Sequence, residues 1–282
     1  MIDADTGACF RTRGAAIDSP GAVGRLLRSR PDSVLAHHRA EVQSHVTILT
    51  ALTADTTPRA LAEVGMEHRS ALLTGIAVEL ALEAAHAADK PVAVAGVLGS
   101  EMVAALQPHR MSEELVEHAT RIAAAGVELI LARGQGSRLE LTAAVAAAAH
   151  TELPTWAVVE CLPGGQLTHG GRLSELCDDL RAAGASAVLF EVSSIDDGLA
   201  LLSQCHEIGA TVVPGILLSA GPDSVRGFPT SGVDPAPWGA RALELDSAGA
   251  RIIGGGAGTT EEFTSALMEE LTALHPSVPA RR

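Results

Sequence analysis

Several features that are common in proteins are scarce in this chain. It contains no Tyr, only 2% aromatic residues, and four Cys that form no Cys-x-x-Cys pair. So few aromatic rings leave little material for a cage around a quaternary ammonium or sulfonium group. The Cys spacing offers neither a disulfide framework nor a Cys-rich zinc motif. We therefore expect all four to be buried, reduced thiols: Cys9, Cys161, Cys177 and Cys205.

Positive charge and long apolar runs are also lacking. Lys and Arg number 20 against 34 Asp and Glu, which gives a formal net charge of −14. This balance makes nucleic acid and anionic membrane surfaces poor partners. No apolar run reaches the roughly 18 residues of a membrane span, and residues 1–5 lack the basic start of a signal peptide. We expect a cytoplasmic protein that binds a small-molecule substrate, and the sequence leaves room for a homo-oligomer.

What the chain does contain is a regular alternation of apolar runs and helical patterns, with 47% hydrophobic residues. Runs of four to eight residues that alternate with helices are typical of βαβ units and a parallel sheet covered on both faces. Eight such units in 282 residues predict a single-domain α/β protein, a (β/α)8 TIM barrel over residues 1–282. The expected strands are residues 2–6, 45–52, 91–98, 127–133, 155–160, 187–192, 211–218 and 250–253. The expected helices are residues 33–44, 58–88 with a break near Gly65, 111–125, 139–150, 173–183, 196–208, 238–248 and 260–274.

Polar residues at the ends of these strands are the candidates for chemistry, because barrels of this kind place their active sites there. They are Asp5, Thr50, Thr53, Arg133, Glu160 and Glu191. In one interpretation, Arg133 pairs with Glu160 or Glu191 in a charge network that closes the barrel. In the other, Arg133 holds a substrate carboxylate while a partly desolvated Glu acts as acid or base. We take Arg133, Glu160 and Glu191 as the candidate catalytic residues.

A glycine run near the C-terminus is the second candidate site. Gly254, Gly255 and Gly256 follow a short strand and precede a helix. Backbone N–H groups at such a junction can bind an anion, and the alternative is that the glycines serve only a tight turn. No Lys or Arg flanks the turn except Arg251, so we favour a carboxylate or a zwitterion over a phosphate.

Cysteine and histidine offer weaker candidates. Cys161 and His169 could form a nucleophilic pair, but Cys161 directly follows Glu160, and adjacent strand residues point to opposite faces. We therefore do not expect a catalytic Cys161. The remaining histidines show no metal-binding spacing, and we expect solvated positions for His37, His38, His118 and His206.

Three segments resemble the homocysteine S-methyltransferase family, whose barrels transfer methyl from betaine, S-methylmethionine or methylfolate to a thiol. Asp3-Ala-Asp-Thr-Gly-Ala-Cys-Phe-Arg-Thr-Arg-Gly14 is similar to the family's opening D-G-G-x-G-T-x-L…G. Residues 31–39 with the strand end at Thr50 to Thr53 resemble its helix followed by T-N-T, and Gly254-Gly-Gly-Ala-Gly-Thr-Thr260 resembles G-G-C-C-G-T-x. The resemblance implies a barrel and a substrate site that includes Asp3, Asp5, Thr50 and Thr53.

The chain departs from the family at the positions that the resemblance links to zinc. The family binds zinc with two adjacent Cys in G-G-C-C-G and a third at the end of strand six, whereas this chain has Gly256-Ala257 and Glu191-Val192 there. Arg133 also replaces the family's Glu at the end of strand four. We therefore expect no metal and no cofactor, with a sulfonium methyl donor as co-substrate. The scarcity of aromatic residues weighs against betaine as that donor.

Three functions remain open at this point. The first is methyl or alkyl transfer from a sulfonium donor to an acceptor other than homocysteine, a small amino-acid-like or sulfur-containing molecule. The second is lyase, hydrolase or isomerase chemistry by Glu160 or Glu191, with Arg133 as the carboxylate anchor. The third is a non-catalytic ligand-binding protein or partner subunit. A pH–rate profile separates the first two, and ligand-induced stabilisation without turnover identifies the third.

Overall fold

Parallel strands form the centre of the molecule. The computed structural model describes residues 1–19, 21–99, 106–134, 137–168 and 170–274. Neighbouring strands run parallel in the order β1-β2-β3-β4-β6-β7-β8, and a short β5 pairs antiparallel with β4. Their bounds are β1 Ile48–Ala51, β2 Ala93–Gly99, β3 Leu129–Arg133, β4 Thr155–Leu162, β5 Gln166–Leu167, β6 Ala187–Val192, β7 Val213–Leu218 and β8 Ile252–Gly255.

A single residue near the N-terminus joins the two edges of this sheet. Ile2 forms parallel bridges to both Ile48 of β1 and Gly254 of β8. Its N–H donates to Ile253 O at 3.0 Å, and the N–H of Asp3 donates to Ile48 O at 3.2 Å. The sheet therefore closes into the expected barrel, with the first strand reduced to the residues around Ile2.

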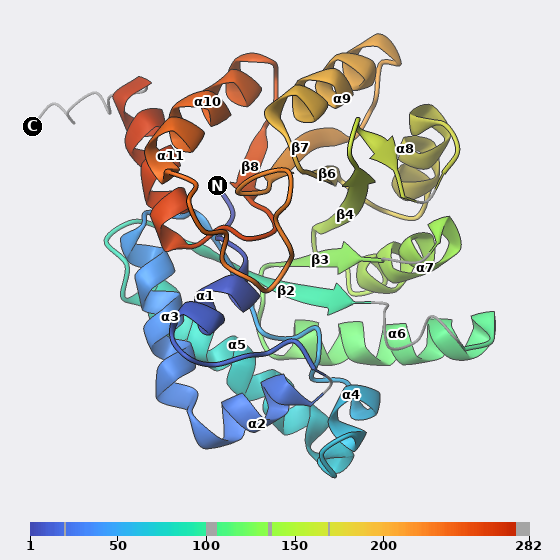
Figure 1. Cartoon of the computed structure of the whole chain (residues 1–282). Helices are drawn as coiled ribbons and strands as arrows, with labels where there is room; N and C mark the ends of the chain where they lie inside the picture. Colours follow the sequence, from blue (N-terminus) through green and yellow to red (C-terminus); the bar gives the residue numbers. More distant parts are fainter. Residues whose placement is uncertain (20, 100–105, 135–136, 169, 275–282) are drawn as a thin grey trace, which may run out of the picture.

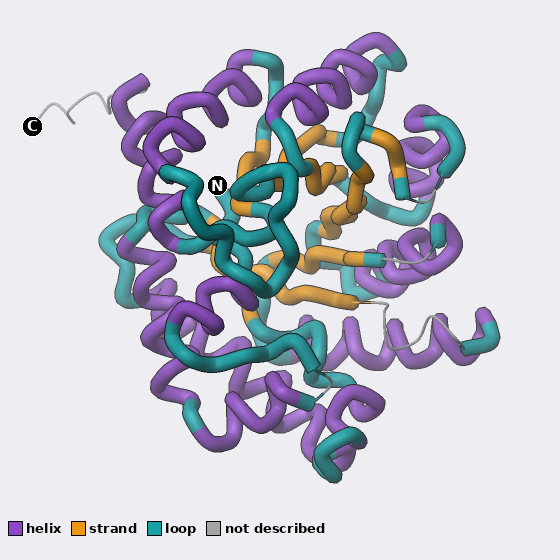
Figure 2. Tube along the Cα trace, viewed as in Figure 1, coloured by secondary structure: helices purple, strands orange, loops and turns teal. Residues whose placement is uncertain are grey.

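Helices surround the strands (Figures 1 and 2). They are α1 Thr6–Thr12, α2 Ala22–Ser29, α3 Pro31–Gln43, α4 Pro58–Ala62, the 3-10 turn η1 Glu67–Arg69, α5 Ser70–His86, α6 Pro108–Ala124, α7 Arg138–Ala149, α8 Leu173–Ala182, α9 Ile195–Glu207, α10 Pro235–Ser247 and α11 Glu261–Leu274. The predicted break near Gly65 falls between α4 and η1, where Gly65 has φ +65°. The sequence prediction did not include α1 and α2, which are short and lie between the expected strand at residues 2–6 and the expected first helix at residues 33–44.

Two apolar layers hold the barrel together. Inside the barrel, side chains such as Leu131, Val158 and Leu189 pack against one another. Outside it, Ile130 and Phe190 pack against the helices. Strands covered on both faces account for the continuous apolar runs in the sequence. None of the described helices is both long and apolar enough to cross a bilayer.

Buried cysteine and histidine side chains complete the packing. All four cysteines are buried and free, as predicted. The expectation for three histidines was wrong, because His37, His38 and His118 are at most 1% exposed. Each lies on a helix face that packs inward, which composition alone does not reveal. His206 is exposed, as expected.

Candidate active site at the barrel mouth

A cavity of about 510 Å³ opens at the carboxyl ends of the strands; we call it the mouth cavity. Its apolar surface comes from strand residues such as Val97, Leu131 and Val158. Its charged groups are Asp3, Asp5, Asp18, Asp55, Arg133 and Arg226. The barrel thus presents charges of both signs beside an apolar surface, as in many small-molecule sites.

Arg133 and Arg226 share one carboxylate at the rim of the mouth cavity. Arg133 Nη2 donates to Glu191 Oε2 at 2.8 Å, and Arg226 Nη2 forms an ion pair with Glu191 Oε1. Burial acts to raise the pKa of Glu191, but the positive charges of Arg226 and Arg133 outweigh it, and the pKa lies below its usual value. Glu191 is therefore an ionised anchor for the two guanidinium groups.

Glu160 is not brought into this group. It is the register partner of Glu191 across β4 and β6, but its side chain is exposed and does not line the mouth cavity. Its backbone oxygen accepts from Thr168 Oγ1 at 2.7 Å, which supports the short turn after β4. Of the three predicted catalytic residues, the structure places Arg133 and Glu191 together and Glu160 apart.

Asp3 provides a buried acid in the wall of the cavity. Its Oδ2 accepts from both the N–H and the hydroxyl of Thr50, each at 2.8 Å. Burial raises the pKa of Asp3 to about 6, although the Thr50 hydrogen bonds act against the shift. Thr53 also lines the cavity, but its hydroxyl donates a hydrogen bond to Val97 O and accepts one from Val97 N. These bonds connect the end of β1 to β2. Asp3 and Thr50 thus form a pair that faces the ligand space, while Thr53 mainly supports the wall.

The glycine turn holds an anion that belongs to the chain itself. Asp5 Oδ2 accepts from Gly258 N at 3.0 Å and from Gly227 N at 2.7 Å. Its Oδ1 accepts from Gly7 N and Ala8 N, which caps α1. Asp5 therefore takes up backbone donors beside the glycines proposed for a ligand carboxylate: Gly258 lies two residues beyond Gly256, and Gly227 lies in the preceding loop.

The predicted glycines themselves serve close packing. A Cβ on Gly256 would lie 2.8 Å from Ser219 N, and one on Gly255 would lie 2.8 Å from Ala4 Cα. The N–H of Gly256 donates to Leu218 O. Gly254 packs in the same way against Ile2. Of the three, Gly255 lines the mouth cavity.

Cys161 lies in the apolar layer outside the barrel. Burial raises the pKa of its thiol to about 12, and nearby carboxylates add to the shift. A protonated thiol is a poor nucleophile, so the expectation against a catalytic Cys161 agrees with its surroundings. His169 lies outside the described residues.

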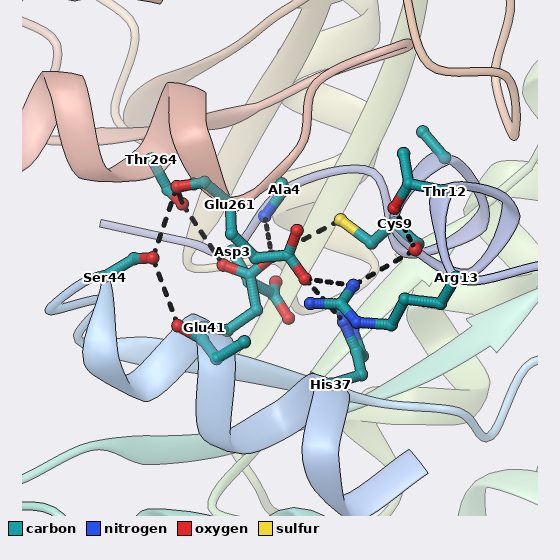
Figure 3. Close-up of polar contacts among 12 residues, drawn as sticks. Asp3, Ala4, Cys9, Thr12, Arg13, His37, Glu41, Ser44, Glu261 and Thr264 are labelled. Atoms are coloured by element: carbon teal, nitrogen blue, oxygen red, sulfur yellow. Dashed lines mark hydrogen bonds and ion pairs between the residues drawn. The ribbon is translucent and has the colours of Figure 1, made fainter. Parts of the chain in front are cut away.

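Behind the wall formed by residues 3–5 lies a second polar group, the donor cluster of Cys9, His37, Glu41 and Glu261 (Figure 3). Cys9 Sγ lies 3.7 Å from Glu41 Oε1, and His37 Nδ1 lies 3.3 Å from Glu261 Oε1. Burial raises the pKa of Cys9 and of Glu41. Burial also acts to raise the pKa of Glu261, but His37 and then Arg13 outweigh it and lower that pKa to about 2. The cluster thus combines sulfur, nitrogen and oxygen donors.

Sequence and structure comparisons agree on the relatives of this chain. A family model described as homocysteine S-methyltransferase matches residues 3–271. The chain belongs to this family. Among curated proteins, none matches the chain in sequence.

The solved structures that resemble this family member include the Escherichia coli homocysteine methyltransferase MmuM. Its metallated form is 19% identical, with 95% of this chain and 94% of that chain covered and a TM-score of 0.76. Its oxidized form has the same identity and coverage and a TM-score of 0.78. A dihydrodipicolinate synthase from Agrobacterium tumefaciens is 15% identical, covering 98% and 78% of the two chains, with a TM-score of 0.54. At these identities the likeness shows the shared barrel fold.

The expectation of no metal was wrong for this family member. MmuM has a metallated form, and this chain contains a four-residue donor set in Cys9, His37, Glu41 and Glu261. At the ends of β6 and β8, by contrast, Val192, Gly256 and Ala257 offer no donor side chain, and Glu191 is ion-paired with two arginines. Those strand ends do not fit a thiolate-bound metal, so we derive no catalytic step through one there.

Arg226 and the donor cluster were missed at the sequence level. Arg226 lies in the long loop after β7, eight residues beyond the last strand residue, Leu218. It is part of no sequence motif. His37 and Glu41 are four residues apart on α3, which places them on one helix face. That spacing is the signal that the sequence contains, and the expectation of solvated positions for His37 and His38 ran against it.

Proposed function

We propose that this chain transfers a methyl or other small alkyl group from a sulfonium donor to a small amino-acid-like or sulfur-containing acceptor other than homocysteine. Family membership supports methyl transfer in general. The finer assignment rests on one observation: the mouth cavity carries Asp3 on one strand and Arg133 three strands further round the barrel, joined there by Arg226. Charges of opposite sign at separate points fit a zwitterion.

In this proposal the arginines bind the carboxylate of the ligand. A guanidinium group can bind a carboxylate through two parallel hydrogen bonds. Glu191, which does not itself line the cavity, holds both arginines in place through ion pairs. Asp3 binds the ammonium group, and Thr50 fixes the orientation of Asp3 through two hydrogen bonds. The apolar strand residues between these groups exclude water from the space in which the alkyl group moves.

The transfer itself is a displacement at carbon. A lone pair on the acceptor attacks the methyl carbon, the carbon–sulfur bond breaks, and its electrons remain on sulfur, which leaves as a neutral thioether. The acceptor proton passes to solvent. The main contribution of the protein is to hold the two reactants in line. The end of β6 carries the ion-paired Glu191 in place of a thiolate that could bind a metal and so activate homocysteine. An acceptor other than homocysteine is therefore favoured.

The acid–base alternative receives less support from the same residues. Glu191 has a lowered pKa and two cationic partners, which makes it a poor proton donor or acceptor near neutral pH. Glu160 is exposed and outside the mouth cavity. We therefore do not advance lyase, hydrolase or isomerase chemistry as a second function.

The test is a product assay with the full chain. The chain is incubated with S-methylmethionine or S-adenosylmethionine and a panel of amino acids and thiols, and methylated products are identified by mass spectrometry. We expect a methylated product other than methionine. Asp3→Asn and Arg226→Gln should each lower kcat/KM by roughly 10–100-fold, because a charged hydrogen bond contributes about 1.5–3 kcal/mol.

Arg59→Gln is the matched control, since Arg59 pairs with Glu114 on the surface, outside the mouth cavity. It should leave kcat/KM unchanged. A clear preference for homocysteine would contradict the proposed acceptor. Ligand-induced stabilisation without any product would instead identify a binding protein.

A further inference from the structure

The donor cluster collects four metal-binding side chains from three helices that are far apart in the sequence. Cys9 lies on α1, His37 and Glu41 lie one turn apart on α3, and Glu261 begins α11. One ligand atom from each residue lies within 4.8 Å of all the others. Figure 3 shows the four side chains turned toward one another, with Asp3 beside them.

The spacing of these atoms matches a tetrahedral metal site. Zinc binds sulfur at about 2.3 Å and nitrogen or oxygen at about 2.0–2.2 Å, so neighbouring ligand atoms in a tetrahedron lie roughly 3.3–3.7 Å apart. Cys9 Sγ and Glu41 Oε1 are 3.7 Å apart, and His37 Nδ1 and Glu261 Oε1 are 3.3 Å apart. Only a small contraction of the remaining distances would bring all four donors around one ion.

The charges of the cluster call for a cation. Cys9, His37 and Glu41 are fully buried, and the side chain of Glu261 is 15% exposed. Arg13 pairs with Glu261 at 2.5 Å. Within the described part of the chain, the hydrogen-bond partners of Glu41 are neutral groups: Ala4 N, Cys9 Sγ and Thr264 Oγ1. A buried carboxylate without a cationic partner is costly and tends to take up a proton instead, and a divalent ion among these donors would let Glu41 bind as the carboxylate.

We propose that Cys9, His37, Glu41 and Glu261 bind one divalent transition-metal ion of the zinc class. One thiolate, one imidazole and two carboxylates form a mixed donor set that suits zinc, and four protein ligands leave no position for a substrate. The site is therefore structural. On binding, a metal–sulfur bond replaces the S–H bond of Cys9, and the proton passes to solvent.

Surrounding contacts already orient these ligands. Ala4 N and Thr264 Oγ1 donate to the two oxygens of Glu41, and Arg13 holds Glu261. Such outer contacts are typical of metal sites. The ion would connect α1, α3 and α11 directly behind residues 3–5, which line the mouth cavity from the other side. This inference does not depend on the methyl-transfer proposal, because the site would stabilise the barrel whatever reaction takes place in the cavity.

Cobalt provides the decisive experiment, because it enters zinc sites and reports their ligands by absorption. The full chain is stripped with a chelator, titrated with Co²⁺ and then with Zn²⁺, and metal content is measured by elemental analysis. We expect one metal ion per chain, a thiolate-to-cobalt charge-transfer band, and visible bands of tetrahedral intensity that disappear when Zn²⁺ replaces Co²⁺. Zn²⁺ at a hundredfold excess over Kd should raise Tm by about 5 °C or more.

Two variants separate this site from any other. Cys9→Ser should abolish the charge-transfer band and weaken Zn²⁺ binding by about 100-fold or more, whereas Cys205→Ser, which alters another buried thiol, should retain both signals. Should Cys9→Ser fail to fold, Glu41→Gln in the same titration provides the second measurement, with loss of stoichiometric binding expected. Substoichiometric metal in the wild-type chain, or a charge-transfer band that persists in Cys9→Ser, would overturn the proposal.

Discussion

The mouth cavity and the donor cluster lie on opposite sides of the same three residues, Asp3 to Asp5, and they use charge differently. In the mouth cavity, guanidinium groups and carboxylates stand at separate points around an open space. In the donor cluster, four ligand atoms face one another, and all lie within 4.8 Å of one another. The first arrangement is suited to an organic zwitterion of substantial volume, and the second to a single small cation.

The largest effect is expected from a substitution at Asp5, one of the three residues that separate the two regions. Asp5→Ala would leave four backbone N–H groups without their acceptor, at Gly7, Ala8, Gly227 and Gly258. Each unpaired buried donor costs about 1–3 kcal/mol, so we expect a loss of at least about 4 kcal/mol in the free energy of unfolding. Urea denaturation measures it. Asp18→Ala removes a surface ion pair with Arg11 and should cost under about 1 kcal/mol.

A smaller loss should follow from Glu191→Gln in the mouth cavity. The substitution keeps the shape of the side chain but leaves Arg133 and Arg226 without their shared negative charge. Removing one partner of a buried pair typically costs about 3–5 kcal/mol, and the partial exposure of both arginines points to the low end, about 3 kcal/mol. Glu175→Gln, at a surface pair with Arg138, is the control in the same urea series. Equal losses in the two variants would show that Glu191 is not an anchor.

The free energy of unfolding should fall in acid because of His118, a buried residue of α6. Its Nε2 lies 2.9 Å from Thr53 O, and burial lowers its pKa from 6.5 to about 4. Because the folded chain binds this proton less readily than the unfolded chain, stability is fully present above pH 6.5 and falls as the pH drops toward 4. We expect a loss of about 2 kcal/mol by pH 5. His118→Gln should flatten this part of the profile of unfolding free energy against pH, whereas a substitution of the exposed His206 should leave its slope unchanged.

The smallest predicted effect concerns ligand affinity at Asp3. With a pKa raised to about 6 by burial, Asp3 gains its charge between pH 5 and pH 7, and the bound ammonium group requires that charge. Calorimetry with S-methylmethionine should therefore show affinity rising roughly tenfold over this interval. Asp3→Asn should remove the rise. If Asp18→Asn at the cavity rim removed it as well, the assignment to Asp3 would be wrong.

The fold could be predicted because most strands and helices have a recognisable local pattern of apolar and polar residues. The expected run at residues 187–192 coincides with β6, and most other elements differ by a few residues at their ends. The first strand could not be delimited, since only Ile2 pairs with both neighbours and Asp5 then caps α1. The other oxygen of the Asp5 carboxylate accepts from backbone groups more than 200 residues away, at Gly227 and Gly258.

Candidate site residues could be predicted only where they stand at the ends of strands. Asp3, Thr50, Arg133 and Glu191 stand at or near strand ends, and the structure brings them to the barrel mouth. Arg226 could not be found in this way, because a long loop carries it into place. The donor cluster needs the relative placement of α1, α3 and α11, and no local pattern encodes the packing of helices that begin at residues 6, 31 and 261.

The closure of the barrel through Ile2 and Asp5 has a consequence for biosynthesis. Ile2 bridges β8, and Asp5 bonds Gly258 across a separation of 253 residues. During translation Ile2 and Asp5 leave the ribosome long before their partners, and Gly258 follows Asp5 only 253 residues later. The nascent barrel therefore remains open between residues 2–5 and β7 until β8 has been made. Contacts of such long range are slow to form, so closure of the barrel waits for β8 and the turn at Gly258.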